Sequence, residues 1–382
     1  MIPYGRQDIR QDDIDAVVEV LRSDFLTQGP AVPAFEAAVA EAAGAEHAVA
    51  MNSATSALHV ACAALDLGPG DVLWTSPVTF VASANCARYC GAEVDFVDIE
   101  PATGNMCPDR LEEKLAAADR AGRLPKILVP VHLAGQSCDM ARIGALARRY
   151  GVRVIEDASH AIGGRYGDAP VGACPHSDIT VFSFHPVKIV TSGEGGAAVT
   201  QDAALSNRMA RLRSHGITRD PEEMTHAPDG PWYYQQVELG WNYRMTDIQA
   251  ALGRAQMERL HDYVARRNAL AERYDALLAD LPLTRPGRAD GVLSAFHLYV
   301  IRVAADRHRA VFEGLRARGV GVNLHYIPVH LQPYYRRLGF GPGNFPEAER
   351  YYAEAISIPL FATMTDAMQD AVVAALSAEL GR

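Results

Sequence analysis

The fold of this chain of 382 residues is indicated most clearly by the stretch Val181-Phe182-Ser183-Phe184-His185-Pro186-Val187-Lys188-Ile189-Val190-Thr191-Ser192-Gly193-Glu194-Gly195-Gly196. Its first half is an apolar run typical of a buried strand, and this run ends near a hydroxyl residue, Ser183. Lys188 follows five positions later, and a glycine-rich turn over Gly193–Gly196 follows the lysine. Glycines permit positive φ angles and a close approach of the backbone, so we expect a tight turn after Lys188.

A second apolar run ends in a carboxylate. This run is Val152-Arg153-Val154-Ile155-Glu156-Asp157, and Ala158-Ser159-His160 follows it. In open α/β sheets, ligands bind at the carboxyl ends of the strands, where Asp157 and Ser183 are expected to lie. A buried lysine can bind the aldehyde of pyridoxal 5′-phosphate (PLP) covalently, and a carboxylate can keep its pyridine nitrogen protonated. Together the two side chains predict a PLP enzyme, although Lys188 alone would be a surface lysine and Asp157 alone a turn residue.

Lys188 is the predicted catalytic residue. Its amine is expected to have a depressed pKa and to act as the general base that moves a proton between the substrate carbon and the cofactor. Asp157 is the predicted partner of the pyridine nitrogen. His160 could lean on the ring of the cofactor or reach its O3′ oxygen, and otherwise it is a structural histidine. Phe80 could stack on the ring, with core packing as the alternative.

The segment Asn52-Ser53-Ala54-Thr55-Ser56-Ala57-Leu58 follows one predicted strand and opens a helix. Small and hydroxyl residues at a helix N-terminus expose backbone N–H groups, and the helix dipole favours a negative charge there. By itself the segment would be an ordinary Ser/Thr helix cap. Its place before Asp157 and Lys188 favours a cradle for the PLP phosphate, to which Ser183 could also donate a hydrogen bond.

Alternating strands and helices predict an α/β fold with a mostly parallel sheet covered by helices. Helical patterns, such as Thr55–Leu67 and Asp139–Tyr150, lie between many of the apolar runs. Seven runs are predicted as strands: His47–Met51, Val72–Ser76, Glu93–Asp98, Lys126–His132, Val152–Asp157, Asp178–Phe184 and Gly196–Thr200.

The rest of the chain predicts an N-terminal arm and a smaller C-terminal α+β domain. We place the arm and the large PLP-binding domain at residues 1–250 and the smaller domain at residues 251–382. The predicted helices here are Asp12–Arg22, Ala203–His215, a long and bent Thr246–Leu281, Arg307–Arg318 and Asp366–Leu380. The predicted strands are His297–Val303 and Gly321–His325. The segments predicted to be irregular are Ser23–Pro33, Arg219–Trp232 and Pro282–Gly291.

The composition is that of an ordinary globular protein, with 49% hydrophobic and 21% charged residues. The net charge is −10 and no basic stripe is visible, so nucleic acid is not an expected partner. No apolar run is long enough to span a bilayer, and the N-terminus lacks the apolar region of a signal peptide, so we expect a cytoplasmic protein that does not bind membranes. The six cysteines are scattered without a CxxC pair, so we expect free thiols and no metal site.

Taken together these segments resemble the DegT-type sugar aminotransferases, a branch of the fold-type I PLP enzymes related to aspartate aminotransferase. The resemblance covers nearly the whole chain. It is carried by Leu26–Pro30, Asn52–Leu58, Pro77–Ala82, Glu156–His160, Phe182–Gly196, Arg213–Gly216 and Gly240–Gly253.

The resemblance implies a homodimer whose active sites lie at the subunit interface. It places Lys188 as the covalent anchor, Asp157 at the pyridine nitrogen, and Ala54, Thr55 and Ser183 around the phosphate. It also implies that Phe80 stacks on the ring, that His160 lies near O3′ and that Asn242 reaches the phosphate of the neighbouring subunit's cofactor.

Within this family the chain is most similar to the aminotransferases of pseudaminic acid biosynthesis. The resemblance implies L-glutamate as the amino donor, 2-oxoglutarate as its product and a UDP-linked 4-keto-6-deoxy-N-acetyl sugar as the acceptor. The loop Arg219–Trp232 is longer than we expect for this subgroup. The implied substrate-binding residues are Tyr4, Asp24, Phe25, Leu26, Thr27, Ser183, Asn242, His325, Tyr326, Ile327 and Pro328.

Several other functions fit parts of the sequence. The acceptor could be another UDP- or dTDP-linked keto sugar, aminated at C4 or at C3. PLP-dependent sugar dehydratases resemble this chain but carry histidine in place of the lysine, so Lys188 argues against them. A non-catalytic PLP-binding regulator would not need Lys188, Asp157 and the implied substrate-binding residues together. A nicotinamide reductase is disfavoured because no G-x-G-x-x-G follows the first strand.

Overall fold

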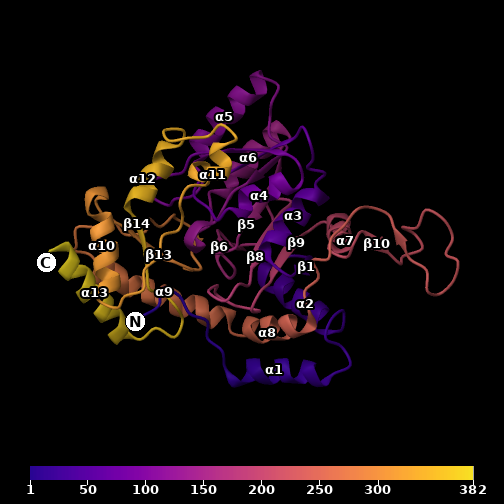
Figure 1. Cartoon of the computed structure of the whole chain (residues 1–382), viewed down its shortest axis with the longest axis horizontal. Helices are drawn as coiled ribbons and strands as arrows, with labels where there is room; N and C mark the ends of the chain where they lie inside the picture. Colours follow the sequence, from indigo (N-terminus) through magenta and orange to yellow (C-terminus); the bar gives the residue numbers. More distant parts are fainter. Residues whose placement is uncertain (382) are drawn as a thin grey trace.

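A seven-stranded sheet in the order β1-β9-β8-β5-β4-β2-β3 forms the centre of the computed structural model, which describes residues 1–381 (Figure 1). Neighbouring strands are parallel except for β9, which runs antiparallel to both β1 and β8. All seven predicted strands are confirmed, and so is the mostly parallel α/β sheet. Their bounds are β1 His47–Met51, β2 Val72–Thr75, β3 Glu93–Phe96, β4 Ile127–Val129, β5 Arg153–Asp157, β8 Ile179–Ser183 and β9 Gly196–Thr200.

Helices cover both faces of the sheet, which is why its strands are apolar throughout. Successive residues point to opposite faces: Leu73 belongs to one core cluster and Trp74 to another. The helices α3 (Ala54–Ala64), α4 (Ala82–Tyr89) and α7 (Ala203–Leu212) pack on the first face. The helices α2 (Ala31–Ala43), α5 (Pro108–Arg120), α6 (Met140–Tyr150) and α8 (Asp247–Met257) pack on the second face.

A buried polar cluster joins β4 and β5 next to Asp157. His132 is fully buried, and its Nε2 lies 2.7 Å from Oε2 of Glu156. The N–H of Cys138 donates to Nδ1 of His132, so the ring proton is on Nε2 and is donated to Glu156. Burial raises the pKa of Glu156, but hydrogen bonds from His132, Ser177 and Thr180 outweigh burial and lower it. The cluster therefore fixes the end of β5 from which Asp157 projects.

The C-terminal part has its own core of residues from α9 onward. The prediction of one bent helix over Thr246–Leu281 is corrected to two helices that are separated at Glu258 and Arg259. The predicted strand Gly321–His325 is wrong, because only Asn323 pairs, with Ser357, before the chain turns toward the main cavity. The elements are α9 Leu260–Leu277, β13 Tyr299–Arg302, α10 Ala305–Ala317, α12 Pro346–Glu354, β14 Ala355–Ile358 and α13 Asp366–Leu380. The division of the chain at residue 250 stays a prediction.

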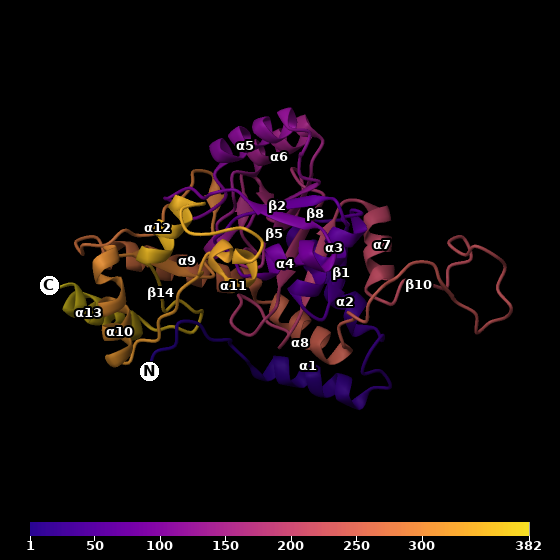
Figure 2. The same ribbon diagram turned by 45° about the horizontal axis from the view of Figure 1, so that its top comes forward.

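Two segments extend from this body. Helix α1 (Gln11–Arg22) lies along α8, and Arg259 binds Asp13 of α1 (Figure 1). The hairpin of β10 (Ile217–Thr218) and β11 (Gln235–Gln236) carries the predicted loop Arg219–Trp232 and projects away from the sheet (Figure 2). The segment predicted to be irregular, Ser23–Pro33, ends earlier than expected because α2 begins at Ala31. Within residues 1–381 no helix has the length and apolar character needed to cross a bilayer.

Candidate active site

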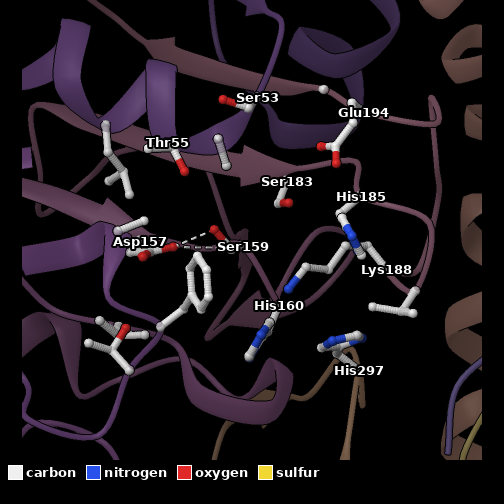
Figure 3. A pocket seen from close by; sticks show the side chains of 18 of the residues that line it. Ser53, Thr55, Asp157, Ser159, His160, Ser183, His185, Lys188, Glu194 and His297 are labelled. Carbon is white, nitrogen blue, oxygen red and sulfur yellow. Dashed lines mark hydrogen bonds between the residues drawn. The ribbon is translucent and has the colours of Figure 1, made fainter. Parts of the chain in front are cut away.

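A cavity of about 880 Å³ opens at the carboxyl ends of β5 and β8 (Figure 3). It brings together residues that are far apart in the sequence. The predicted site residues that line it are Tyr4, Ala54, Thr55, Phe80, Asp157, His160, Ser183, Lys188, His325 and Tyr326. The predicted residues that do not line it in this one chain are Asp24, Phe25, Leu26, Thr27, Asn242, Ile327 and Pro328.

Lys188 lies in the loop that connects β8 to β9, and its side chain points into the cavity (Figure 3). The loop is held by Thr191 and Ser192, which both donate hydrogen bonds to the carbonyl oxygen of Phe184. Gly193 has a φ of 80°, so the predicted tight turn after the lysine is confirmed. Burial lowers the pKa of Lys188 to about 8, and the negative charge of Asp157 partly opposes this effect. About a tenth of the amine is therefore neutral and nucleophilic at pH 7, whereas an exposed lysine has less than about a thousandth in that form.

The covalent attachment of PLP to Lys188 is expected to speed up with pH and to level off above about pH 8, because only the neutral amine is a nucleophile. An exposed lysine would keep gaining reactivity up to about pH 10.4. Cofactor-free protein can be mixed with PLP between about pH 6 and pH 10, following the visible absorbance of the attached cofactor. Lys188→Ala is the control, because it cannot attach PLP covalently and should not show this change in absorbance. A midpoint near that of an exposed lysine would contradict a buried Lys188.

Asp157 is held in one orientation by three hydrogen bonds. Its Oδ2 accepts a hydrogen bond from the hydroxyl of Ser83 at 2.6 Å, and its Oδ1 accepts hydrogen bonds from the hydroxyl and the N–H of Ser159 at 2.6 and 3.1 Å. Because the one hydroxyl hydrogen of Ser83 is donated to Asp157, the hydroxyl of Thr79, 2.7 Å from that of Ser83, donates its hydrogen bond to Ser83. The carboxylate is 5% exposed and lines the cavity, so it presents a fixed negative charge to a ligand.

The N-terminus of α3 forms the other end of the cavity. Ser53 caps the helix by accepting a hydrogen bond from the N–H of Ser56 at 3.1 Å, which leaves the N–H groups of Ala54 and Thr55 available to an anion. Gly196 leaves room for this turn: a Cβ atom at that position would lie 2.3 Å from the backbone nitrogen of Ala54. The buried Ser183 lines the same cavity.

The residues present fit PLP. The helix N-terminus matches a phosphate, the fixed carboxylate of Asp157 matches a protonated ring nitrogen, and the buried amine of Lys188 matches an aldehyde. The ring of Phe80 is 58% exposed at the cavity, so one of its faces is open to a planar ligand.

Histidines and a tyrosine form the wall opposite Asp157. The N–H of Ala134 donates to Nδ1 of His160, so His160 carries its proton on Nε2, 3.1 Å from the hydroxyl oxygen of Tyr326. Both ring nitrogens of His160 therefore have partners. Burial, with a smaller contribution from the charge of Lys188, lowers the pKa of His160 and His297 well below the usual range and that of His325 to about 4.

Sequence reasoning missed several residues at this site. Ser159 and His185 lie within the motifs that carried the prediction, and their position beside Asp157 and Lys188 could have indicated them. His297 had no such signal, because it comes from the C-terminal part of the chain and meets the others only in the fold. The missed lining residues include Thr79, Ser159, His185, Glu194, Gln249 and His297, whereas Ser53 and Ser56 belong to the segment predicted as the phosphate cradle.

Comparisons with known proteins agree with this site. A model of the DegT/DnrJ/EryC1/StrS aminotransferase family matches residues 7–377. The spore coat polysaccharide biosynthesis protein SpsC of Bacillus subtilis (strain 168) is 38% identical over 382 residues, covering 98% of this chain and 96% of SpsC.

Solved structures give the same result. PseC of Helicobacter pylori, an aminotransferase involved in the biosynthesis of pseudaminic acid, superposes with a TM-score of 0.91 at 30% identity and covers 99% of each chain. Spr1654 of Streptococcus pneumoniae is 29% identical to this chain. Its pyridoxamine phosphate (PMP) form superposes with a TM-score of 0.91 and covers 99% of each chain. Its PLP form superposes with a TM-score of 0.89 and covers 99% of this chain and 98% of that one. The chain therefore belongs to the DegT/DnrJ/EryC1/StrS aminotransferase family, and it is a PLP-dependent sugar aminotransferase of fold type I.

Proposed function

We propose that this aminotransferase transfers the amino group of L-glutamate to C4 of a UDP-4-keto-6-deoxy-N-acetylhexosamine. The product would be UDP-4-amino-4,6-dideoxy-N-acetyl-β-L-altrosamine, an intermediate of pseudaminic acid biosynthesis. The observation that carries the proposal is the full-length match to PseC, at 30% identity and a TM-score of 0.91. His325 and Tyr326, which are among the implied substrate-binding residues, line the same cavity as Lys188, and this supports an acceptor sugar at this wall.

Each residue of the site has a defined task in this reaction. Bound PLP supplies an electron sink, which allows a proton to leave and return at the carbon that carries the transferred nitrogen. Lys188 takes that proton from the donor carbon and returns one at the acceptor carbon, since its buried amine can be neutral near physiological pH. Asp157 orients and charges the cofactor, and Ala54, Thr55 and Ser183 bind its phosphate.

A homodimer with shared active sites is part of the proposal. Asn242 is exposed, pairs through its backbone with Ser214, and lies outside the cavity of its own chain. Phe25 and Leu26 are neighbours on the N-terminal arm and are about half exposed, at 53% and 49%, so they offer apolar surface that a partner would bury. A second copy of the chain would cover this arm and receive Asn242 at its own phosphate site.

A different acceptor is the second candidate. SpsC, named for spore coat polysaccharide biosynthesis, is more identical to this chain, at 38%, than PseC is. This favours another UDP- or dTDP-linked keto sugar, aminated at C4 or C3, as the alternative. A non-catalytic regulator is supported less well, because the covalent anchor, the fixed carboxylate and the phosphate cradle are all present in one cavity.

Turnover is expected with a UDP-linked 4-keto-6-deoxy-N-acetyl sugar and not with its dTDP-linked or 3-keto counterparts, because the proposed acceptor has its ketone at C4 and carries UDP. The enzyme with glutamate can be tested on this panel, measuring 2-oxoglutarate and the amino sugar. Turnover only with a dTDP-linked 3-keto sugar would contradict the acceptor and leave the aminotransferase assignment intact. A protein that did not convert PLP to pyridoxamine phosphate with glutamate would contradict the amino donor.

A further inference from the structure

His297 is placed in the active cavity without a partner of its own. It lies two residues before β13, is 4% exposed and lines the cavity that holds Lys188 (Figure 3). Its Nδ1 is buried and has no hydrogen-bond partner within residues 1–381. A buried polar nitrogen without a partner costs free energy, so the fold maintains this histidine at a cost that a ligand can offset.

A fully buried arginine holds the backbone around His297. Arg267 of α9 is 2% exposed, and its Nη1 donates to the carbonyl oxygens of Phe296, His297 and Leu360 at 3.2, 3.3 and 3.1 Å. Phe296 has a φ of 44°, a left-handed conformation that is rare for a non-glycine residue. Arg267 is thus a positioning residue that fixes the direction of the His297 side chain.

The same arginine makes this wall of the cavity positive. Burial lowers the pKa of Arg267 to about 10, so it stays charged at neutral pH, and its neighbours at hydrogen-bond distance are carbonyl oxygens instead of carboxylates. Among the described residues that line the cavity, Lys188 is the only lysine or arginine. Because Lys188 is occupied by the cofactor, the positive charge that remains for an anionic substrate group at this wall is that of Arg267, and the neutral imidazole of His297 in front of it is a hydrogen-bond donor.

We propose that the imidazole of His297, with the charge of Arg267 behind it, binds the α-carboxylate of the amino donor. This inference rests on the proposed amino donor, L-glutamate. The α-carboxylate is bonded to the carbon that loses its nitrogen, so it must lie beside Lys188 during the reaction. The diphosphate of a nucleotide sugar is attached at C1, several bonds from the reacting carbon, and the γ-carboxylate is also further away.

Three amino donors, three variants and one control variant test this assignment in the first half-reaction, the conversion of PLP to pyridoxamine phosphate, which is followed by absorbance. L-Isoglutamine carries an amide in place of the α-carboxylate, and L-glutamine carries one in place of the γ-carboxylate. His297→Leu is expected to lower the second-order rate constant about tenfold to hundredfold for glutamate and for glutamine, which corresponds to one charged hydrogen bond. For isoglutamine the expected loss is less than about threefold, because that donor lacks the charged acceptor.

His297→Gln keeps an N–H donor and is expected to recover part of the selectivity for glutamate over isoglutamine. Arg267→Met is expected to reduce the ratio of the rate constant for glutamate to that for isoglutamine. A merely structural defect would lower the rates with glutamate and isoglutamine equally and leave that ratio unchanged. If Arg267→Met does not fold, as judged by circular dichroism, the His297 variants decide the question. His261→Leu, which changes an exposed histidine of α9, is the matched control and should leave all three rates unchanged.

The possible outcomes separate clearly. Equal losses with all three donors would overturn the assignment in favour of a general packing role, and a loss spared only with glutamine would assign the γ-carboxylate instead. Unchanged rates in His297→Leu would also overturn it. A wild-type enzyme that does not react with glutamate would contradict the proposed donor, whereas one that reacts with glutamate but aminates no sugar of the panel would contradict only the proposed acceptor.

Discussion

Turnover is expected to fall by about 10⁴-fold or more when Lys188 is replaced by alanine, because one side chain provides both the covalent anchor and the general base. The variant should still bind PLP without covalent attachment, since Asp157 and the N-terminus of α3 are unchanged. The measurements are the amination rate with glutamate and a keto sugar, and the visible absorbance of the attached cofactor. A Lys188→Ala enzyme that cycles at a rate close to the wild type would contradict the assignment.

Lys188→Arg is the matched control for charge. A guanidinium stays protonated at every relevant pH and is a poor nucleophile, so this variant keeps the positive charge but loses both chemical tasks. We expect it to be as inactive as Lys188→Ala. Substantial activity in Lys188→Arg would mean that the charge of the lysine matters and its free amine does not.

Asp157→Asn is expected to lower kcat about hundredfold or more, because an amide cannot keep the ring nitrogen of the cofactor protonated by its charge. The volume of the side chain is unchanged, and Ser83 and Ser159 remain as neighbours. The loss should appear in both half-reactions, because both need the same electron sink. Single-turnover absorbance measurements with glutamate and, separately, with the keto sugar test this expectation.

Ser83→Ala gives a graded comparison for Asp157. It removes the hydroxyl that donates to Oδ2 at 2.6 Å and leaves the charge in place. The expected loss is about tenfold, in the range typical for a residue that orients a functional group. If Ser83→Ala were as damaging as Asp157→Asn, the orientation of the carboxylate would account for its whole effect, and its charge would not.

The sheet could be predicted from the sequence because both of its faces are buried. Its strands are therefore short continuous apolar runs with clear ends, and all seven were found. The helix α2 was not predicted. Its sequence is rich in alanine and has few polar residues, so it shows no clear alternation of an apolar and a polar face. The strand β14 was not predicted, and the strand Gly321–His325 was predicted wrongly. Both concern the small C-terminal sheet of two strands, in which packing decides which segment pairs with β13.

The half of the site that depends on local sequence could be predicted, and the half that depends on distant contacts could not. Asp157 lies at the end of a strand, Thr55 at the start of a helix and Lys188 in the loop that follows a strand, where spacing indicates their chemistry. His297 and Arg267 carry no such pattern, since their relation exists only after α9 packs beside the segment before β13. Asn242 lies outside the cavity of its own chain, so its predicted role depends on a second copy.

The position of β1 at the edge of the sheet has a consequence for biosynthesis. Its only partner in the sheet, β9, lies about 150 residues further along the chain, on the far side of the loop that carries Lys188. At roughly 5–20 residues per second, a ribosome needs about 8–30 seconds to deliver that partner. During this interval β1 is an unpaired apolar strand, so a nascent chain interrupted before residue 200 would be a substrate for chaperones. The loop that carries Lys188 closes only when β9, the last strand of the sheet in sequence, has been synthesised.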